Sequence, residues 1–313
     1  MLINNPKNKS KDLIVVLGPT ASGKTKLAVE LALTLNGEII SADSRQIYKK
    51  MDIGTGKDLD EYIINNKKIP YHLIDIHDPM FNYNLSKFLN DFEISFNYIK
   101  SKKKQPILCG GTGLYIKSVL LNFQIPPVAP NILLRSKLEK LNLNQLKKEL
   151  EKIKPKISNK VPTDTKRRII RNIEVELYRK QPKQLNPKKS IKQFNNDNTT
   201  VIGINYPRKI IRERITSRLI HRLNNGMVKE VESLLKEGVS SKRLEDFGLE
   251  YKYINHFLNK KISKNEMISK LNTAIHQFAK KQMTFFRNIE KNGVKINWVD
   301  NTELISILKL IDK

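Results

Sequence analysis

The stretch Leu13-Ile-Val-Val-Leu17, followed by Gly18-Pro-Thr-Ala-Ser-Gly23-Lys24-Thr25, decides the fold. The apolar, largely β-branched run predicts a buried strand, and residues 26–36 continue with a helical pattern. The loop between them fits G-x-x-x-x-G-K-[ST], which in this strand-to-helix context is a phosphate loop, or P-loop. Its glycines let successive backbone N–H groups surround a phosphate at the helix N-terminus. The sequence therefore predicts an α/β protein that binds a di- or triphosphate group.

The side chains of this loop suggest how the phosphate is held. Lys24 supplies a point charge for the outer phosphate, and the Thr25 hydroxyl is a candidate ligand for Mg²⁺. A glycine-rich turn without a ligand is the alternative interpretation. The candidate diphosphate-binding residues of the loop are Gly18, Pro19, Thr20, Ala21, Ser22, Gly23, Lys24 and Thr25.

The order of patterns along the chain predicts three parts. Residues 1–125 alternate short β-branched runs (13–17, 38–41, 72–76 and 106–109) with helical patterns, as parallel βαβ units do. After a Pro-Pro break, residues 130–179 are helical in pattern and 181–200 resemble an exposed loop. Residues 201–205 and 294–299 predict strands, with helices over 209–288 between them. We thus expect a P-loop NTPase-like parallel sheet core (1–125), an inserted all-helical basic domain (126–200) and a helical C-terminal part that completes the core (201–313).

The charge is concentrated outside the predicted core. The 313 residues include 58 Lys and Arg against 31 Asp and Glu, a net charge of +27. Residues 126–200 alone hold 19 basic and 7 acidic side chains. Such an excess is typical of proteins that bind polyanions, although a Lys-rich proteome also produces basic surfaces.

Cysteine content and hydropathy exclude several classes of protein. The single cysteine, Cys109, excludes an internal disulfide framework and a Cys-based zinc site. The apolar run Leu13–Leu17 is too short for the apolar region of a signal peptide, and no stretch approaches the ~18 apolar residues that span a membrane. We expect a cytoplasmic protein that does not bind membranes.

Two polar residues follow strands at the edge where open α/β sheets bind ligands. Asp43 comes just after the predicted strand at 38–41, and Thr112 follows the strand at 106–109. Local turn or cap roles are equally compatible with their spacing. A nucleoside triphosphatase would place an Asp at the end of the 106–109 strand to hold the metal, and glycines stand there instead. Asp75 is the best substitute carboxylate.

Two further patterns are ambiguous. Gly54-Thr-Gly56-Lys57 resembles a phosphate loop but has no preceding strand, so a turn is expected. Arg214, Arg218 and Arg222 share one helix face, which suits either phosphate binding or solvation.

Several ordered strings resemble the bacterial tRNA dimethylallyltransferase (isopentenyltransferase) family over roughly residues 13–300. They are the P-loop itself, Ser41-Ala-Asp-Ser-Arg-Gln-Ile-Tyr48, Met51-Asp-Ile-Gly-Thr55, Tyr71-His-Leu-Ile-Asp75, Gly110-Gly-Thr-Gly-Leu-Tyr115, Arg168-Ile-Ile-Arg-Asn-Ile-Glu174 and Gln277-Phe-Ala-Lys-Lys-Gln-Met-Thr-Phe-Phe-Arg287. Gly248-Leu-Glu-Tyr251 departs from the family's Gly-Tyr-Arg-like string, which puts one tRNA contact in doubt. The zinc finger of eukaryotic members is absent.

The resemblance implies a reaction and a role for each site residue. The P-loop would hold dimethylallyl diphosphate, and the allyl group would pass to N6 of the adenosine just 3′ of the anticodon in tRNA. Asp43 would accept the amine proton, and Thr112 would lie near the transferring carbon or the metal. Lys24, Arg218 and Mg²⁺ at Thr25 would stabilise the diphosphate. The implied tRNA contacts are Asp43, Ser44, Arg45, Gln46, Arg135, Arg167, Arg168, Ile169, Ile170 and Arg171, in an enzyme that acts as a monomer.

Other functions remain compatible with the residues. A small-molecule P-loop kinase lacks the strand-end Asp and needs no large basic insertion. A non-catalytic RNA-binding protein does not need Asp43 and Thr112 at the ligand edge. A prenyltransferase that acts on free adenine nucleotides differs only in its acceptor. The sequence does not decide which tRNAs are modified, whether ATP binds, or whether Cys109 matters.

Overall fold

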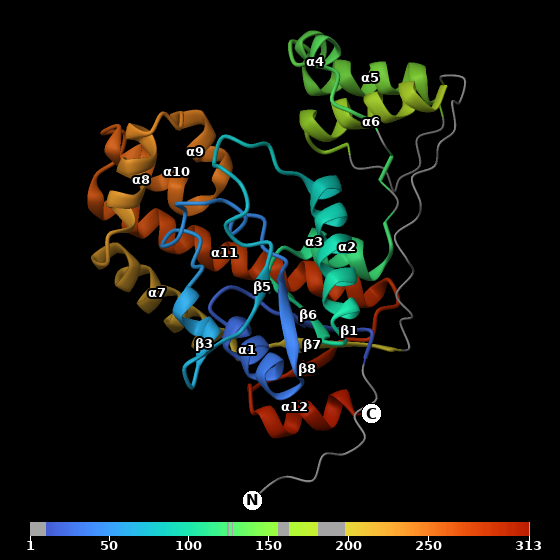
Figure 1. Ribbon diagram of the computed structural model, residues 1–313. Helices are drawn as coiled ribbons and strands as arrows, with labels where there is room; N and C mark the ends of the chain where they lie inside the picture. Colours follow the sequence, from blue (N-terminus) through green and yellow to red (C-terminus); the bar gives the residue numbers. More distant parts are fainter. Residues whose placement is uncertain (1–10, 124, 127, 156–162, 181–197, 313) are drawn as a thin grey trace, which may run out of the picture. The chain divides into compact units, whose positions relative to one another are not determined.

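The chain forms two compact units, residues 1–123 with 191–313 and residues 124–190. The computed structural model describes residues 11–312 except 124, 127, 156–162 and 181–197 (Figure 1). The expected insertion of 126–200 extends too far, because Thr199 and Thr200 already belong to a strand of the first unit. Of the expected loop at 181–200, residues 181–197 lie outside the described residues.

The first unit is built on a six-stranded sheet with the order β5-β2-β6-β1-β7-β8. All neighbouring strands pair in parallel. The strands are β1 (Leu13–Leu17), β2 (Gly37–Ser41), β5 (Tyr71–His72), β6 (Gln105–Gly110), β7 (Thr199–Ile204) and β8 (Asn297–Val299). This architecture confirms the expected α/β fold with a P-loop-like parallel core.

Helices cover both faces of this sheet, as parallel sheets require. Every residue of β1, β2 and β6 is buried. Alternate strand residues such as Ile14, Ile107 and Ile202 form one apolar core with helix α1 (Lys24–Thr34) and the C-terminal helix α12 (Leu304–Ile311). Helices α2 (Leu85–Ser101) and α3 (Gly113–Leu120) pack against each other beside β6.

Two expected strands are shorter than the sequence pattern suggested. The strand expected at 72–76 is only Tyr71–His72, because Leu73 and Asp75 have φ of 63° and 55° and the chain leaves the sheet there. The strand expected at 294–299 is Asn297–Val299. A one-turn 3-10 helix (Leu59–Tyr62) and a small hairpin of β3 (Ile63–Ile64) and β4 (Lys67–Lys68) precede β5.

The helical C-terminal part joins the same unit. It consists of α7 (Arg208–Asn224), α8 (Met227–Lys236), α9 (Ser241–Phe247), α10 (Leu249–Leu258) and α11 (Lys264–Lys291). A capping box of Ser263 and Glu266 begins α11, which buries one stripe of residues along its whole length. Gln282 is the polar member of that stripe.

The second unit contains α4 (Ile132–Leu138), α5 (Leu143–Ile153) and α6 (Lys166–Lys180), as the sequence predicted. A capping box of Asn142 and Gln145 begins α5. The expectation that Ile169 and Ile170 contact tRNA is wrong for their side chains, which are buried in the apolar core of this unit with Leu146. The packing of α6 against α5 places both side chains on the inner face of α6.

No helix in the described part of the chain combines the length and the apolar run that crossing a bilayer requires.

Candidate active site

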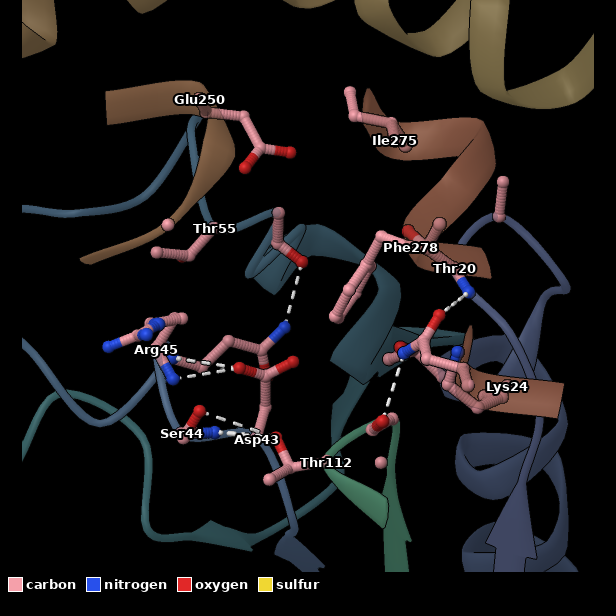
Figure 2. A pocket seen from close by; sticks show the side chains of 18 of the residues that line it. Thr20, Lys24, Asp43, Ser44, Arg45, Thr55, Thr112, Glu250, Ile275 and Phe278 are labelled. Atoms are coloured by element: carbon pink, nitrogen blue, oxygen red, sulfur yellow. Dashed lines mark hydrogen bonds between the residues drawn. The ribbon is translucent and has the colours of Figure 1, made fainter. Parts of the chain in front are cut away.

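The register of the sheet brings three chain segments to one edge. Leu17 pairs with Gly110, and Ser41 pairs with Cys109, so the P-loop, Asp43 and Thr112 all follow at the carboxyl ends of adjacent strands. Gly110 permits this closeness, because a Cβ there would lie 2.3 Å from the backbone oxygen of Ala42. The strand ends therefore meet at one edge of the sheet, as predicted, and these residues line one cavity of about 440 Å³ (Figure 2).

Two cationic side chains line this cavity, Lys24 from the P-loop and Arg218 from α7. Gly23 has φ 79°, a left-handed conformation that glycine adopts without strain, and α1 begins at Lys24. Lys24 Nζ donates to the Pro19 backbone oxygen at 2.7 Å and forms no ion pair within the described residues. Burial lowers the pKa of Lys24 to about 8. Arg218, from α7, donates to the Thr20 hydroxyl, and burial lowers its pKa to about 10.

Gln282 joins the P-loop to the end of β6. Its Oε1 accepts from Thr20 N at 2.9 Å, and its Nε2 donates to the Gly111 oxygen at 2.9 Å. A buried amide with both ends bonded fixes the separation of two loops that carry site residues. Sequence reasoning assigned Gln282 no role, although it lies in a quoted motif. Its place as a polar residue in a buried helical stripe was the available signal.

One carboxylate oxygen of Asp43 accepts hydrogen bonds from the backbone, and the other accepts none from the described residues. Its Oδ1 accepts from Arg45 N at 2.8 Å and from Gln46 N at 3.4 Å, which is the local turn that the spacing allowed. Its Oδ2 accepts no hydrogen bond from any described residue. The turn therefore orients the carboxylate and leaves a lone pair free in the cavity.

Thr112 ties the second strand end to the Asp43 turn. The Thr112 hydroxyl accepts a hydrogen bond from Ser44 N at 3.0 Å. In the same turn, Gln46 Nε2 donates to the Gly56 backbone oxygen at 2.9 Å. Arg45 also lines the cavity, where burial lowers the pKa of its guanidinium. The structure thus brings Asp43, Ser44, Arg45, Gln46 and Thr112 together, as the sequence predicted.

The second glycine loop is not a phosphate site. The Lys57 side chain is 0% exposed and bonds the carboxylates of Asp52 and Asp75 as well as the Tyr48 backbone oxygen. The expected turn at Gly54–Lys57 is confirmed. The prediction that Asp75 substitutes as a metal ligand is wrong, because Asp75 does not line the cavity and its Oδ1 bonds Lys57.

The segment that departs from the family pattern lies in the cavity wall. Gly248, with φ 135°, joins α9 to α10, and Glu250 points into the cavity (Figure 2). Burial raises the pKa of Glu250. Tyr251 packs over Gly54 and donates to Glu230 at 2.8 Å, and the same carboxylate accepts from the backbone N–H groups of residues 52–54.

The donor set fits Mg²⁺ held jointly with a diphosphate. Mg²⁺ usually keeps several waters and takes one or two protein oxygens plus phosphate oxygens. Thr25 offers such an oxygen at the start of α1, and it lines the cavity. The described residues contain no cluster of three His, Cys, Asp or Glu side chains that could bind a metal ion by themselves. Burial raises the pKa of Cys109 to about 12, so its thiol stays neutral.

The family of IPP transferases matches residues 46–289 of this sequence. This chain belongs to that family. Among curated members, the tRNA dimethylallyltransferase 2 of Phocaeicola vulgatus is 47% identical over 92% of each chain. The tRNA dimethylallyltransferase 1 of Azobacteroides pseudotrichonymphae is 48% identical over 96% of this chain and 97% of its own.

Solved structures of family members share the fold. The tRNA isopentenylpyrophosphate transferase of Bacillus halodurans has a TM-score of 0.67 and 29% identity, covering 97% of this chain and 95% of its own. The corresponding transferase of Staphylococcus epidermidis has a TM-score of 0.64 and 32% identity over 96% of each chain. A eukaryotic dimethylallyltransferase acting on tRNA has a TM-score of 0.73 at 23% identity, over 95% of this chain and 75% of its own, which shows the fold alone.

Four arginines of the helical unit were predicted to contact tRNA, and they differ in the protein groups that they bond. Arg135 of α4 bonds the buried Glu174 of α6 at 2.8 Å and so joins the two helices. Arg171, also of α6, bonds the same carboxylate at 3.2 Å and donates to the Val128 backbone oxygen at 2.8 Å. Arg168 pairs with Asp164, and both side chains are exposed. Arg167 is exposed and has no ion-pair partner among the described residues. Arg167 and Arg168 are therefore the two that a phosphate can reach without breaking a buried contact.

Proposed function

We propose that this protein transfers a dimethylallyl group from dimethylallyl diphosphate to N6 of the adenosine just 3′ of the anticodon in tRNA. The enzyme is a tRNA dimethylallyltransferase, a prenyltransferase that releases diphosphate. One observation within the chain carries the proposal. A single cavity holds two cations, Lys24 of the P-loop and Arg218 of α7, together with a carboxylate, Asp43, one oxygen of which has no partner among the described residues.

The chemistry needs both halves of this cavity. The exocyclic amine of adenine is a weak nucleophile, because its lone pair is delocalised into the ring. As the amine nitrogen bonds to C1 of the allyl group, the C1–O bond breaks and its electron pair leaves with the diphosphate. Asp43 Oδ2 accepts the amine proton as the new bond forms, as a general base does. The hydrogen bonds to Oδ1 hold the carboxylate in place.

Negative charge grows on the diphosphate as the allylic bond breaks, and fixed cations in a desolvated site stabilise it. Lys24 carries no protein counter-ion within the described residues, so its charge is available for the leaving group. Arg218 reaches the same loop through Thr20. Mg²⁺, when bound with Thr25, would add further positive charge beside the diphosphate oxygens.

The tRNA must place its adenine inside the cavity, so the base has to leave its stack. Ser44, Arg45 and Gln46 follow Asp43 directly and line the cavity wall where a flipped nucleotide would enter. Lys and Arg contacts with the backbone would supply most of the affinity. We propose that Arg167 and Arg168 contribute such contacts from the helical unit, and that the enzyme acts as a monomer.

The test offers two donors and two acceptors. Labelled dimethylallyl diphosphate and labelled ATP are each incubated with unmodified tRNA and with free AMP. We expect label to pass from dimethylallyl diphosphate to tRNA, and Asp43→Asn to abolish most of that transfer. Equal transfer to AMP would identify an enzyme for free nucleotides, and phosphorylation from ATP alone would identify a kinase.

A further inference from the structure

One wall of the cavity takes no part in the phosphate or proton chemistry described above. Ile275, Phe278 and Phe285 line it from α11. Figure 2 shows the ring of Phe278 pointing into the cavity, between Thr20 and Lys24 of the P-loop and the Asp43–Thr112 pair. Its side chain is 45% exposed, whereas Ile275 and Ala279 on the same helix are each 6% exposed. The ring thus projects from the buried stripe of α11 into the space of the site.

The proposed reaction fixes what must occupy that space. The diphosphate lies against Lys24 and Arg218, and the acceptor amine lies at Asp43. The hydrocarbon of the donor therefore has to lie between these two positions, which is where the Phe278 ring points. An aromatic ring offers apolar area to a hydrocarbon and leaves no partner for a polar group.

We infer that Phe278 is the wall that limits the transferred prenyl group to five carbons. This inference rests on the proposed function and makes Phe278 a specificity-determining residue of it. A geranyl chain is five carbons longer than a dimethylallyl chain, and Phe278→Ala removes the six ring carbons. A cavity packed to the size of one ligand rejects a longer one because the surrounding side chains cannot all give way.

The test measures kcat/KM for dimethylallyl diphosphate and for geranyl diphosphate with the same tRNA. We expect the wild type to favour the shorter donor strongly. Phe278→Ala should raise the ratio of geranyl to dimethylallyl use by at least ~10-fold, since even one methylene changes selectivity by about 10- to 200-fold. Phe278→Leu, which removes less of the side chain, should raise the ratio by a smaller factor.

A binding measurement separates space from catalysis. The inhibition constant of geranyl diphosphate against dimethylallyl diphosphate should fall in Phe278→Ala in step with the change in kcat/KM. Phe81→Ala is the matched control, because Phe81 is 36% exposed and does not line the cavity. It should leave both the ratio and the inhibition constant at their wild-type values.

The outcomes distinguish this inference from the function on which it rests. A wild type that transfers no dimethylallyl group to tRNA would remove the proposed function. An active wild type whose donor ratio is left unchanged by both Phe278→Leu and Phe278→Ala would overturn the role of Phe278 alone. A loss of activity with both donors in equal measure would also overturn it, because it would show a structural role instead.

Discussion

Two glycine loops of this protein end in Lys, and only one is built to hold a phosphate. Lys24, at the end of the P-loop, bonds a backbone oxygen and has no carboxylate partner among the described residues. Lys57, at the end of the Gly54–Lys57 loop, is fully buried and bonds two carboxylates. The acidic neighbours differ in the same way, since Asp75 Oδ1 bonds the Lys57 ammonium, whereas no cationic side chain among the described residues bonds Asp43.

The difference shows what a Gly-Lys pattern needs before it signals an anion site. A lysine whose charge is already balanced by protein carboxylates has little attraction left for phosphate, and moving it would break both of its ion pairs. A desolvated lysine without a counter-ion gains most when an anion arrives. The two loops therefore differ in whether their lysine has a carboxylate partner, and substitutions at each loop test this difference.

The largest effect is expected at the two aspartates. Asp43→Asn removes the basic lone pair but keeps the size and turn-forming ability of the side chain, so turnover should fall by roughly 10²–10⁴-fold. Affinities for tRNA and diphosphate should change little, and added magnesium should not restore turnover. Asp75→Asn should instead lower the melting temperature and leave turnover of the folded enzyme near normal. Near-wild-type turnover of Asp43→Asn, measured by single-turnover transfer, would remove Asp43 from the mechanism.

At the P-loop lysine, we expect loss of function without loss of fold. Lys24→Met should lower kcat by about 10²–10³-fold, as removal of one charge-stabilising donor does. Its thermal stability should match or exceed that of the wild type, because an unpaired buried charge is gone. Gel-shift affinity for tRNA should stay unchanged, and a parallel loss of tRNA binding would contradict this division of labour.

The opposite result is expected for the lysine of the second loop. Lys57→Met leaves Asp52 and Asp75 without their shared cation, which should reduce the free energy of unfolding by about 3 kcal/mol, the lower end for a broken buried pair. Both carboxylates are partly exposed, which is why the lower end applies. Urea unfolding measures the change. An unaltered stability would show that the carboxylates are solvated well enough without Lys57.

The pH dependence of diphosphate binding sharpens the comparison further. The pKa of Lys24 is lowered to about 8 in the protein without ligand, so the charged form is lost as pH rises through that value. Calorimetry should therefore show dimethylallyl diphosphate binding that weakens above pH 8 and takes up protons there. Stability of the free protein should rise over the same interval up to pH 10.5, since the unfolded chain binds the extra proton. Lys24→Met should show neither trend.

The smallest effect is expected in the helical unit, where the arginines also differ in whether they have a carboxylate partner. Arg167 has no ion-pair partner among the described residues, whereas Arg171 holds the buried Glu174. Arg167→Ala should reduce the slope of log affinity for tRNA against log salt by about one phosphate contact. Arg171→Ala should mainly lower the melting temperature of the protein. An unchanged slope in Arg167→Ala would mean that this face is only solvated.

Much of the fold and part of the site follow from local sequence. The apolar run at Leu13–Leu17 is too short and too β-branched for anything but a buried strand, and the glycines of the P-loop fix the conformation that follows. Asp43 and Thr112 were found because parallel strands end at one edge of a sheet. The helices of residues 130–179 followed from their spacing, although the same spacing did not reveal that Ile169 and Ile170 face inward.

By itself, therefore, the sequence determined the class of fold, the phosphate loop and the strand-end residues, because these depend on neighbours along the chain. Only the tertiary structure decided which charged and polar side chains bond other residues of the protein and which are available to a ligand. Lys57 meets Asp75 across 18 residues, Arg135 meets Glu174 across 39, and Gln282 reaches Thr20 across 262. Pairing over such distances depends on how the elements pack, and no local pattern records it.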